Sequence, residues 1–219
     1  MSSAAATTPS SRRKYPALER LVVMLAASLL LAGCLATTAP PQGPVNATLT
    51  FGHTEVMALD VAEIDLAEAW QQPGQPPHIG HLVPNNPVRI IRTWTRDRLR
   101  AVPGGLGAAD GSLLRVTLLD GSVTEKPLPV EKGVEGFFKD QADTRIEAVC
   151  EVAVDLIDPV TGRIGGISVK VEGKRDILES ASLNERDRIR FALMEEIATS
   201  LNQELENGIR AELGYIIRR

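Results

Sequence analysis

Residues 146–156 carry an apolar side chain at every even position, with acidic residues at several of the odd ones. The even positions are Ile146, Ala148, Cys150, Val152, Val154 and Leu156. Turn-forming residues follow at 158–162, and apolar and polar side chains alternate again over 167–171. Because successive side chains of a strand point to opposite faces, the two runs predict an antiparallel hairpin with one buried face.

A long helix is predicted after this hairpin, over residues 183–213, with Asn184 as its candidate cap. Its apolar side chains recur at every fourth residue: Ile189, Leu193, Ile197, Leu201, Leu205, Ile209 and Leu213. A spacing of four drifts by about 40° per step on a helix of 3.6 residues per turn. The helix must therefore wrap around the sheet, bend near Gly208, or offer its far end to another partner. The simplest interpretation is a helix that covers the sheet.

Shorter patterns precede the hairpin. Apolar residues at odd positions predict a strand or a strand pair within 48–64. The stretch 71–87 contains five prolines and is expected to be a surface loop. A short strand is expected over 113–119, with Asp120-Gly121 as its turn.

A second helix is predicted between that loop and that strand. Asn86 can cap it, and Pro87 suits its first position, where a missing N–H costs nothing. Apolar residues then recur at helical spacing as far as Val102, and Pro-Gly-Gly at 103–105 ends the pattern. The chain is therefore predicted to be α+β, with a small antiparallel-rich sheet of about four strands and two helices packed on one face.

The N-terminus has the layout of a secretory signal. A basic segment, 12–20, precedes an apolar run of 11 residues, 21–31, and small residues then lead to Cys34. A helix that spans a bilayer needs about 20 residues, so this run is too short for a permanent anchor. The pattern predicts a leader that is removed by cleavage.

The residues Leu31-Ala32-Gly33-Cys34 resemble the lipobox of bacterial lipoproteins. The resemblance implies cleavage before Cys34, transfer of diacylglycerol to its thiolate, and addition of a fatty acyl group such as palmitate to the new N-terminus. No other cofactor is expected. The chain would then comprise a signal peptide (1–33), a flexible tether (34–44) and a single α+β periplasmic domain (45–219). An ordinary secretory signal or an uncleaved anchor with a chance cysteine is the alternative.

Leu35 follows the cysteine. In Gram-negative lipoproteins an Asp at this position tends to retain the protein in the inner membrane. The resemblance therefore implies an outer-membrane location on the periplasmic face, with the inner membrane as the less favoured alternative.

The predicted hairpin, with Thr144-Arg145-Ile146 before it and Asp158–Arg163 at its turn, is followed by a helix that carries Glu185-Arg186-Asp187-Arg188. Over residues 86–213 this order resembles the LptE-like lipoproteins of lipopolysaccharide assembly and the auxiliary lipoproteins of lipid-trafficking ABC systems. The resemblance implies a non-enzymatic accessory of envelope biogenesis or of lipid transport, which acts by binding a partner or a lipid. A structural or regulatory lipoprotein that acts on the cell wall or its synthases is the alternative.

The charge balance limits the partners. Removal of the leader takes away four basic residues and one acid, and leaves 20 Lys+Arg against 27 Asp+Glu in residues 34–219, a net charge of −7. An acidic domain argues against nucleic acid as the ligand, which attracts basic domains. The expected partners are the membrane, through the lipid anchor, and an envelope protein or anionic lipid.

No residue pattern predicts an active site. Cys150 lies on the apolar side of a strand, where it behaves as a small hydrophobe. His78 and His81 lie in the proline-rich loop without a nearby carboxylate, so no metal site is predicted, and His53 is expected to be an ordinary strand residue. The chain is therefore predicted not to be an enzyme, and an enzyme or small-ligand receptor, which would need a closed polar pocket, remains a third hypothesis.

Arg89, Arg92, Arg96 and Arg100 recur along the predicted second helix. At about 100° per residue they fall within a band of about 80°, whereas Arg98 falls on the other side, toward the apolar face. A solvated face is one interpretation. The other is an anion-binding or partner-binding surface, since guanidinium groups bind phosphates with two hydrogen bonds.

Overall fold

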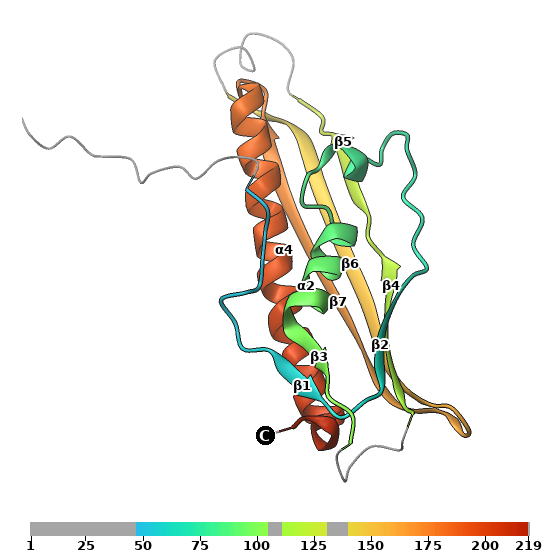
Figure 1. The fold of residues 1–219 in the computed structure, drawn as a ribbon. Coiled ribbons are helices and arrows are strands. Elements are labelled where there is room, and N and C mark those ends of the chain that lie inside the picture. The colour runs from blue at the N-terminus through green and yellow to red at the C-terminus, as the bar shows by residue number, and fades with distance from the viewer. Residues whose placement is uncertain (1–46, 105–110, 131–139, 219) are drawn as a thin grey trace, which may run out of the picture. The chain divides into compact units, whose positions relative to one another are not determined.

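The computed structural model describes residues 47–104, 111–130 and 140–218 (Figure 1). The chain divides into two units, Met1–Gln42 and Gly43–Arg219, and every element described below belongs to the second. The predicted leader and the predicted tether, with Cys34, lie outside the described residues. The elements are β1 (Met57–Leu59), β2 (Glu63–Glu68), η1 (Gly80–Leu82), α2 (Pro87–Arg98), β3 (Leu99–Ala101), β4 (Leu113–Asp120), β5 (Val123–Pro127), β6 (Ala142–Asp158), β7 (Gly162–Leu178), α4 (Leu183–Glu212) and η2 (Gly214–Ile216).

β6 and β7 form the antiparallel hairpin that the alternation predicts. Each strand has 17 residues, so the hairpin extends beyond the predicted apolar segments at both ends. Val152 lies opposite Val169, and Val154 lies opposite Ile167. All six apolar even positions of β6 are buried, each with at most 1% of its surface exposed. The prediction is confirmed, and β6 is the central strand of the core.

β4 and β5 pair one after the other with β6, both antiparallel to it. The register shifts between Leu118 and Asp120, which is a β-bulge, and the ladder then continues, because the N–H of Val149 donates to the carbonyl of Ser122 at 2.9 Å. The chain does not reverse direction here. The predicted turn at Asp120-Gly121 is therefore wrong.

The remaining strands are short and parallel. β2 adds to β4, with Leu66 opposite Val116, and completes a five-stranded sheet that is otherwise antiparallel. β1 and β3 form a separate two-stranded sheet, with Met57 opposite Leu99. The predicted strand or strand pair within 48–64 overlaps β1 and the start of β2, which pair with β3 and β4 and not with each other.

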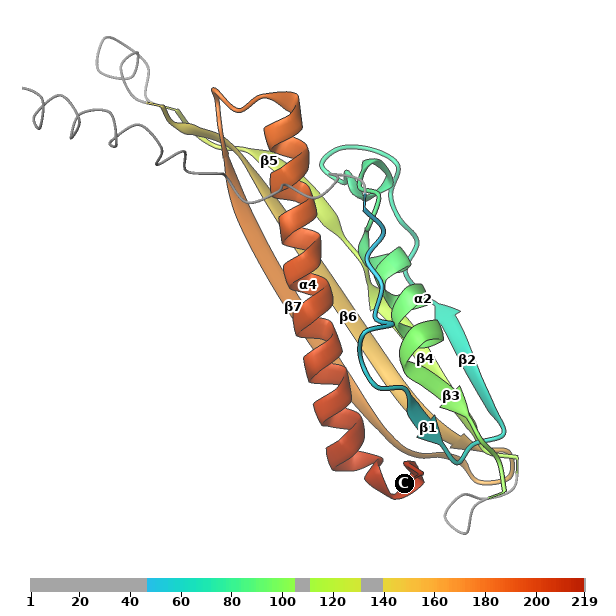
Figure 2. The same ribbon diagram turned by 60° about the vertical axis from the view of Figure 1, so that its left-hand side comes forward.

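Both helices lie on one face of the five-stranded sheet (Figure 2), and the α+β architecture is as predicted. In α2 the side chain of Asn86 accepts a hydrogen bond from the N–H of Arg89 at 3.0 Å, and Pro87 is the first helical residue. The helix ends at Arg98, not at Val102, because the following residues extend to pair with β1 as β3. In α4 the cap is Ser182 and not Asn184, since the Ser182 hydroxyl accepts from the N–H of Glu185.

α4 runs beside β7 (Figure 2), and its stripe of apolar side chains, which recur every four residues, points toward the sheet. Every member of the stripe from Leu193 onward is buried, and Ile189 is partly buried. A side chain at Gly173 would meet the Leu193 side chain at 2.7 Å, and one at Gly208 would meet Ile167 at 2.8 Å. Because sheets twist, a helix that stays in contact with one long strand presents a drifting stripe. Of the alternatives for this helix, the structure therefore shows the one in which it covers the sheet.

Candidate functional site

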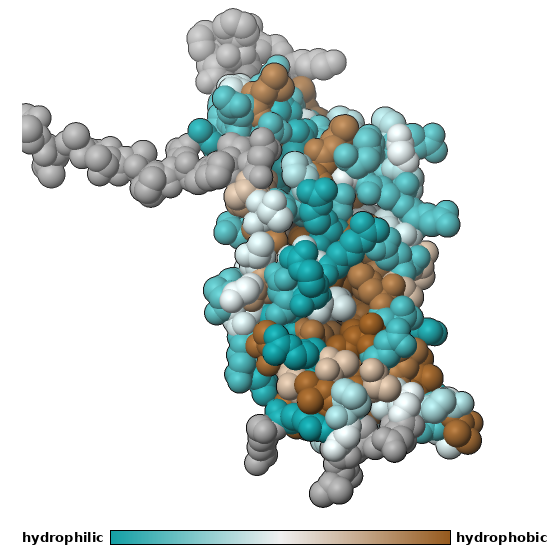
Figure 3. Space-filling model, in the orientation of Figure 1, coloured by the Kyte–Doolittle hydropathy of each residue, from teal (hydrophilic) through white to brown (hydrophobic). Residues whose placement is uncertain are grey.

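Arg89, Arg92 and Arg96 lie on the side of α2 that faces away from the core, here called the outer face of α2. All three are exposed, and the side chains of Arg92 and Arg96 are 61% and 70% exposed. Figure 3 shows hydrophilic side chains over the region of α2. The helical spacing thus places these three arginines together, as predicted.

Arg100 does not join them on the helix. It is an exposed residue of β3, opposite Ala58 of β1. Because α2 ends at Arg98, the helical spacing that grouped Arg100 with the other three arginines does not apply to it. That part of the prediction is corrected.

Two of the three arginines have carboxylate partners. Arg92 is held by Glu68 of β2 through two hydrogen bonds, of which the Nη2–Oε2 contact measures 2.9 Å, and the hydrogen bond and charge of Glu68 raise the pKa of Arg92. Arg96 Nε lies 2.8 Å from Asp97 Oδ1. Arg89 has no ion pair within the described part of the chain. The sequence gives no signal for Glu68, because the contact depends on how β2 packs beside α2.

Arg98 lies on the opposite side of α2 and is 1% exposed. Its Nε donates to Asn202 Oδ1 of α4 at 2.8 Å, and its other nitrogens bind the carbonyl of Glu55 and the carboxylate of Glu206. Trp94 Nε1 donates to the same Asn202 oxygen at 3.1 Å. This buried guanidinium, in which each nitrogen makes a hydrogen bond, joins α2 to α4.

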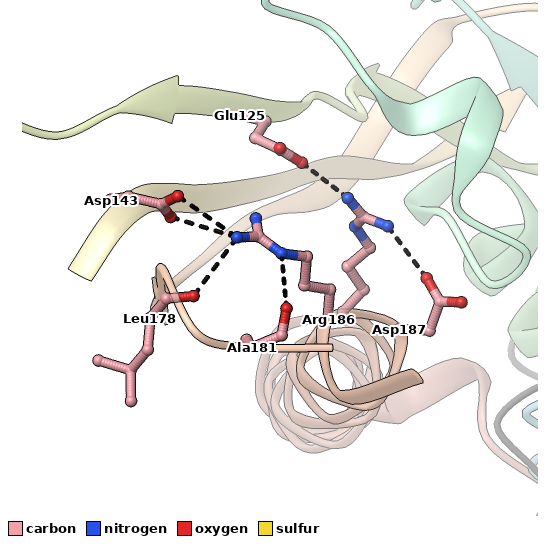
Figure 4. A network of polar contacts seen from close by, with 7 residues as sticks. Glu125, Asp143, Leu178, Ala181, Arg186 and Asp187 are labelled. Atoms are coloured by element: carbon pink, nitrogen blue, oxygen red, sulfur yellow. Dashed lines mark hydrogen bonds and ion pairs between the residues drawn. The ribbon is translucent and has the colours of Figure 1, made fainter. Parts of the chain in front are cut away.

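Two arginines of α4 form a second network of polar contacts (Figure 4). Arg186 donates to the carboxylate of Asp143 at 3.3 Å and to the carbonyls of Leu178 and Ala181. Arg190 donates to Glu125 and Asp187, each at 3.0 Å. These contacts fasten the start of α4 to β5, to β6 and to the end of β7. The ion pairs of Arg186 and Arg190 thus fix the start of α4 on the sheet.

Cys150 and His78 are both packed against other side chains. Cys150 is fully buried, and burial, followed by the charge of Asp120, raises the pKa of its thiol to about 12. His78 packs beside Trp70 with ring centroids 6.2 Å apart. Among the described residues no three His, Cys, Asp or Glu side chains gather as metal ligands, and no helix is long and apolar enough to cross a membrane.

No protein-family model matches the chain, and no curated protein matches it. Among solved structures, it is similar to the rare lipoprotein B of Shewanella oneidensis, with 15% identity over 66% of this chain and 97% of that chain and a TM-score of 0.29. It is also similar to a minor lipoprotein of Acinetobacter baumannii, with 10% identity over 65% and 91% of the two chains and a TM-score of 0.32. Both are lipoproteins by name. At such TM-scores the likeness carries no argument about the role of this chain.

Proposed function

We propose that the chain is a non-enzymatic lipoprotein of the bacterial envelope, anchored through lipid on Cys34 to the periplasmic face of the outer membrane. Its α+β domain binds anionic groups through the outer face of α2, and phosphates of lipid or lipopolysaccharide are the preferred ligands. In this role it serves envelope biogenesis or lipid transport as an accessory. An acidic envelope protein is the alternative ligand.

The anchoring part of the proposal is supported by the sequence. The lipobox-like residues Leu31–Cys34 follow an apolar run that is too short to span a bilayer. Attachment through lipid then leaves the whole domain free to act at the membrane surface, and an anchored protein meets a membrane-bound ligand at high effective concentration.

The binding part depends on one observation, the gathering of three exposed arginines on a single helical face in an acidic chain. Like charges three to four residues apart destabilise a helix slightly, so the arrangement is not explained by helix stability. Arginine forks match the oxygens of a phosphate. The Arg92–Glu68 pair, with side chains 61% and 30% exposed, does not block such a ligand, because exposed ion pairs contribute only about 0–1 kcal/mol. Asp97 is 14% exposed and is also held by the N–H of Phe51, so it stays beside Arg96.

The binding test compares two triple variants of the full chain on vesicles. Replacing Arg89, Arg92 and Arg96 by Gln preserves helix propensity and is expected to weaken retention on anionic vesicles about tenfold at low salt, at roughly 0.5 kcal/mol for each lost contact. The matched control replaces Arg163, Arg188 and Arg210, which are exposed elsewhere, and has the same net charge. Neutral vesicles should bind all forms alike, and the difference should shrink at high salt.

Equal weakening by the two triple variants would show that net charge alone drives retention, and would refute the assignment to α2. If neither variant changes vesicle binding while the first abolishes capture of an acidic envelope protein, the ligand is the protein. The thermal midpoint of each variant is measured first, so that loss of binding is not confused with unfolding.

The anchor is tested separately. Cys34→Ala should abolish incorporation of labelled fatty acid and leave an unprocessed precursor, because no other residue at the cleavage site offers a thiolate. The control, Cys150→Ala, should be labelled like the wild type. Labelling of the Cys34→Ala chain, or processing of the wild type without any label, would contradict the anchor.

A further inference from the structure

β7 is an edge strand. Within the described part of the chain it pairs only with β6, although it has 17 residues. α4 covers one face of it (Figure 2) and forms no ladder with its free edge. A long edge presents unpaired backbone N–H and C=O groups, to which another strand can add.

Charges of alternating sign follow this edge. Lys170, Glu172, Lys174 and Asp176 stand at every second residue, so they share the face of the sheet that points away from α4, and all four are exposed. The odd positions between them face the helix, where Val171 is 8% exposed. The edge is therefore charged on one face, and the signs sum to zero.

A second copy of β7 could pair antiparallel with the first in several registers, which differ in the charges that they place opposite each other. With the two-fold axis at Gly173, Lys170 lies opposite Asp176 of the second copy, and Glu172 lies opposite its Lys174. Symmetry repeats both contacts, so all four charges meet the opposite sign. Moving the axis by one residue, to Glu172 or to Lys174, places like charges opposite each other. An axis at Val171 pairs only Lys170 with Glu172, and leaves Lys174 opposite Ser168.

The surroundings of Gly173 suit this axis. Glycine at the dyad places no side chain between the copies on the helix side, where Leu193 of α4 already lies so close that a Cβ would meet it at 2.7 Å. An open hollow of about 740 Å³ lies at the same place, lined by Gly173, Lys174 and Arg175 together with residues of β6 and α4. Within the described part of the chain, no strand other than β6 pairs with this stretch of β7.

We propose that the free edge of β7 is the interface of a homodimer, in which the strands of two copies pair antiparallel over residues 168–178 with Gly173 at the two-fold axis. The two five-stranded sheets become one continuous sheet. The interface is isologous, as two-fold interfaces are, and cross-strand pairs of opposite charge stabilise the chosen register and disfavour its neighbours. Edge charges often prevent pairing, but a neutral alternating pattern attracts its own antiparallel copy. The inference is independent of the outer face of α2.

The test measures the mass of the full chain in a neutral detergent, by light scattering corrected for the detergent and over a range of protein concentrations. We expect a dimer. Lys174→Glu places like charges opposite each other twice across the axis, and should raise the dissociation constant about tenfold or more. The double exchange Glu172→Lys with Lys174→Glu restores opposite signs in the Gly173 register and should restore the dimer. In the Val171 register the same double exchange places two lysines opposite each other.

A matched control separates the edge from the rest of the sheet. Lys126 of β5 binds Glu147 of β6 at 2.5 Å, and Lys174 lies opposite the same Glu147. Lys126→Glu therefore creates a similar repulsion with Glu147 within one copy but does not change the free edge of β7. This variant should remain dimeric. Thermal midpoints verify that each variant is folded. A monomeric wild type at all concentrations, a dimeric Lys174→Glu chain, or a double exchange that stays monomeric would each overturn the proposal.

Discussion

Both sides of α2 carry arginines, but they are buried on one side and exposed on the other. On one side Arg98 is 1% exposed, and its guanidinium is bound by α4 and by the carbonyl of Glu55. On the other side Arg92 and Arg96 are 61% and 70% exposed, with single carboxylate partners. The difference shows that the angular position of an arginine on this helix decides whether its guanidinium is buried between helices or exposed to solvent.

The largest difference in stability between the two sides of α2 is expected when the Arg98 side chain is removed. Arg98→Ala should lower the free energy of unfolding by about 3 kcal/mol, because it leaves a void and deprives Asn202 and Glu206 of a buried partner. Denaturant titration measures this loss. Arg89→Ala, on the other side of the helix, should change stability by about 0.5 kcal/mol or less. Equal losses for the two variants would remove the distinction between the two sides.

Asn202 tests whether the buried side acts as a network. Its Oδ1 accepts from Arg98 Nε and from Trp94 Nε1, so Asn202→Leu leaves two buried donors without an acceptor and should cost about 2 kcal/mol. Asn207→Leu, at an exposed position of the same helix, is the matched control and should be nearly neutral. If the control is as destabilising as Asn202→Leu, the loss arises from leucine on α4 and not from the lost acceptor.

The sequence could predict on which side of α2 each arginine lies, but not the partners of Arg98. Helical geometry alone places Arg98 on the apolar side of α2 and Arg89, Arg92 and Arg96 on the other side, and the structure agrees. The partners of Arg98 could not be predicted, because Asn202 and Glu206 are 104 and 108 residues away along the chain. Such contacts depend on how two helices pack, which a periodic pattern does not encode.

The same limit explains what was missed elsewhere. β6 was predictable because its buried face is apolar at every even position. β5 was not predicted, since Val-Thr-Glu-Lys-Pro has no apolar alternation and is held by its ladder with β6. The end of α2 was misplaced because Leu99 is apolar at a helical spacing, yet its position is decided by pairing with Met57 of β1.

Asp97 lies between the two sides and gives a pH-dependent prediction. Burial raises its pKa, but hydrogen bonds from Arg96 and from the N–H of Phe51 more than offset this, so the pKa is lowered overall. A carboxyl with a lowered folded-state pKa adds stability that is fully present above its unfolded value of about 3.9 and is lost as the pH falls through the folded value. Asp97→Asn should therefore lose about 1 kcal/mol at neutral pH and show less loss of stability below about pH 4. Parallel pH profiles for the variant and the wild type would contradict this.

The smallest effect is expected for the contact between Arg92 and Glu68, and its size bears directly on the proposed binding. The pair has two hydrogen bonds, yet the side chains are 61% and 30% exposed. Water and salt weaken such a pair, so Arg92→Gln should cost about 0.5 kcal/mol at low salt and almost nothing at high salt. A double-mutant cycle with Glu68→Gln isolates the coupling. A coupling of about 2 kcal/mol, unaffected by salt, would contradict the exposed-pair estimate. Glu68 would then fasten β2 to α2 too firmly for a phosphate to displace it, which would leave Arg89 and Arg96 as the groups available to an anionic ligand.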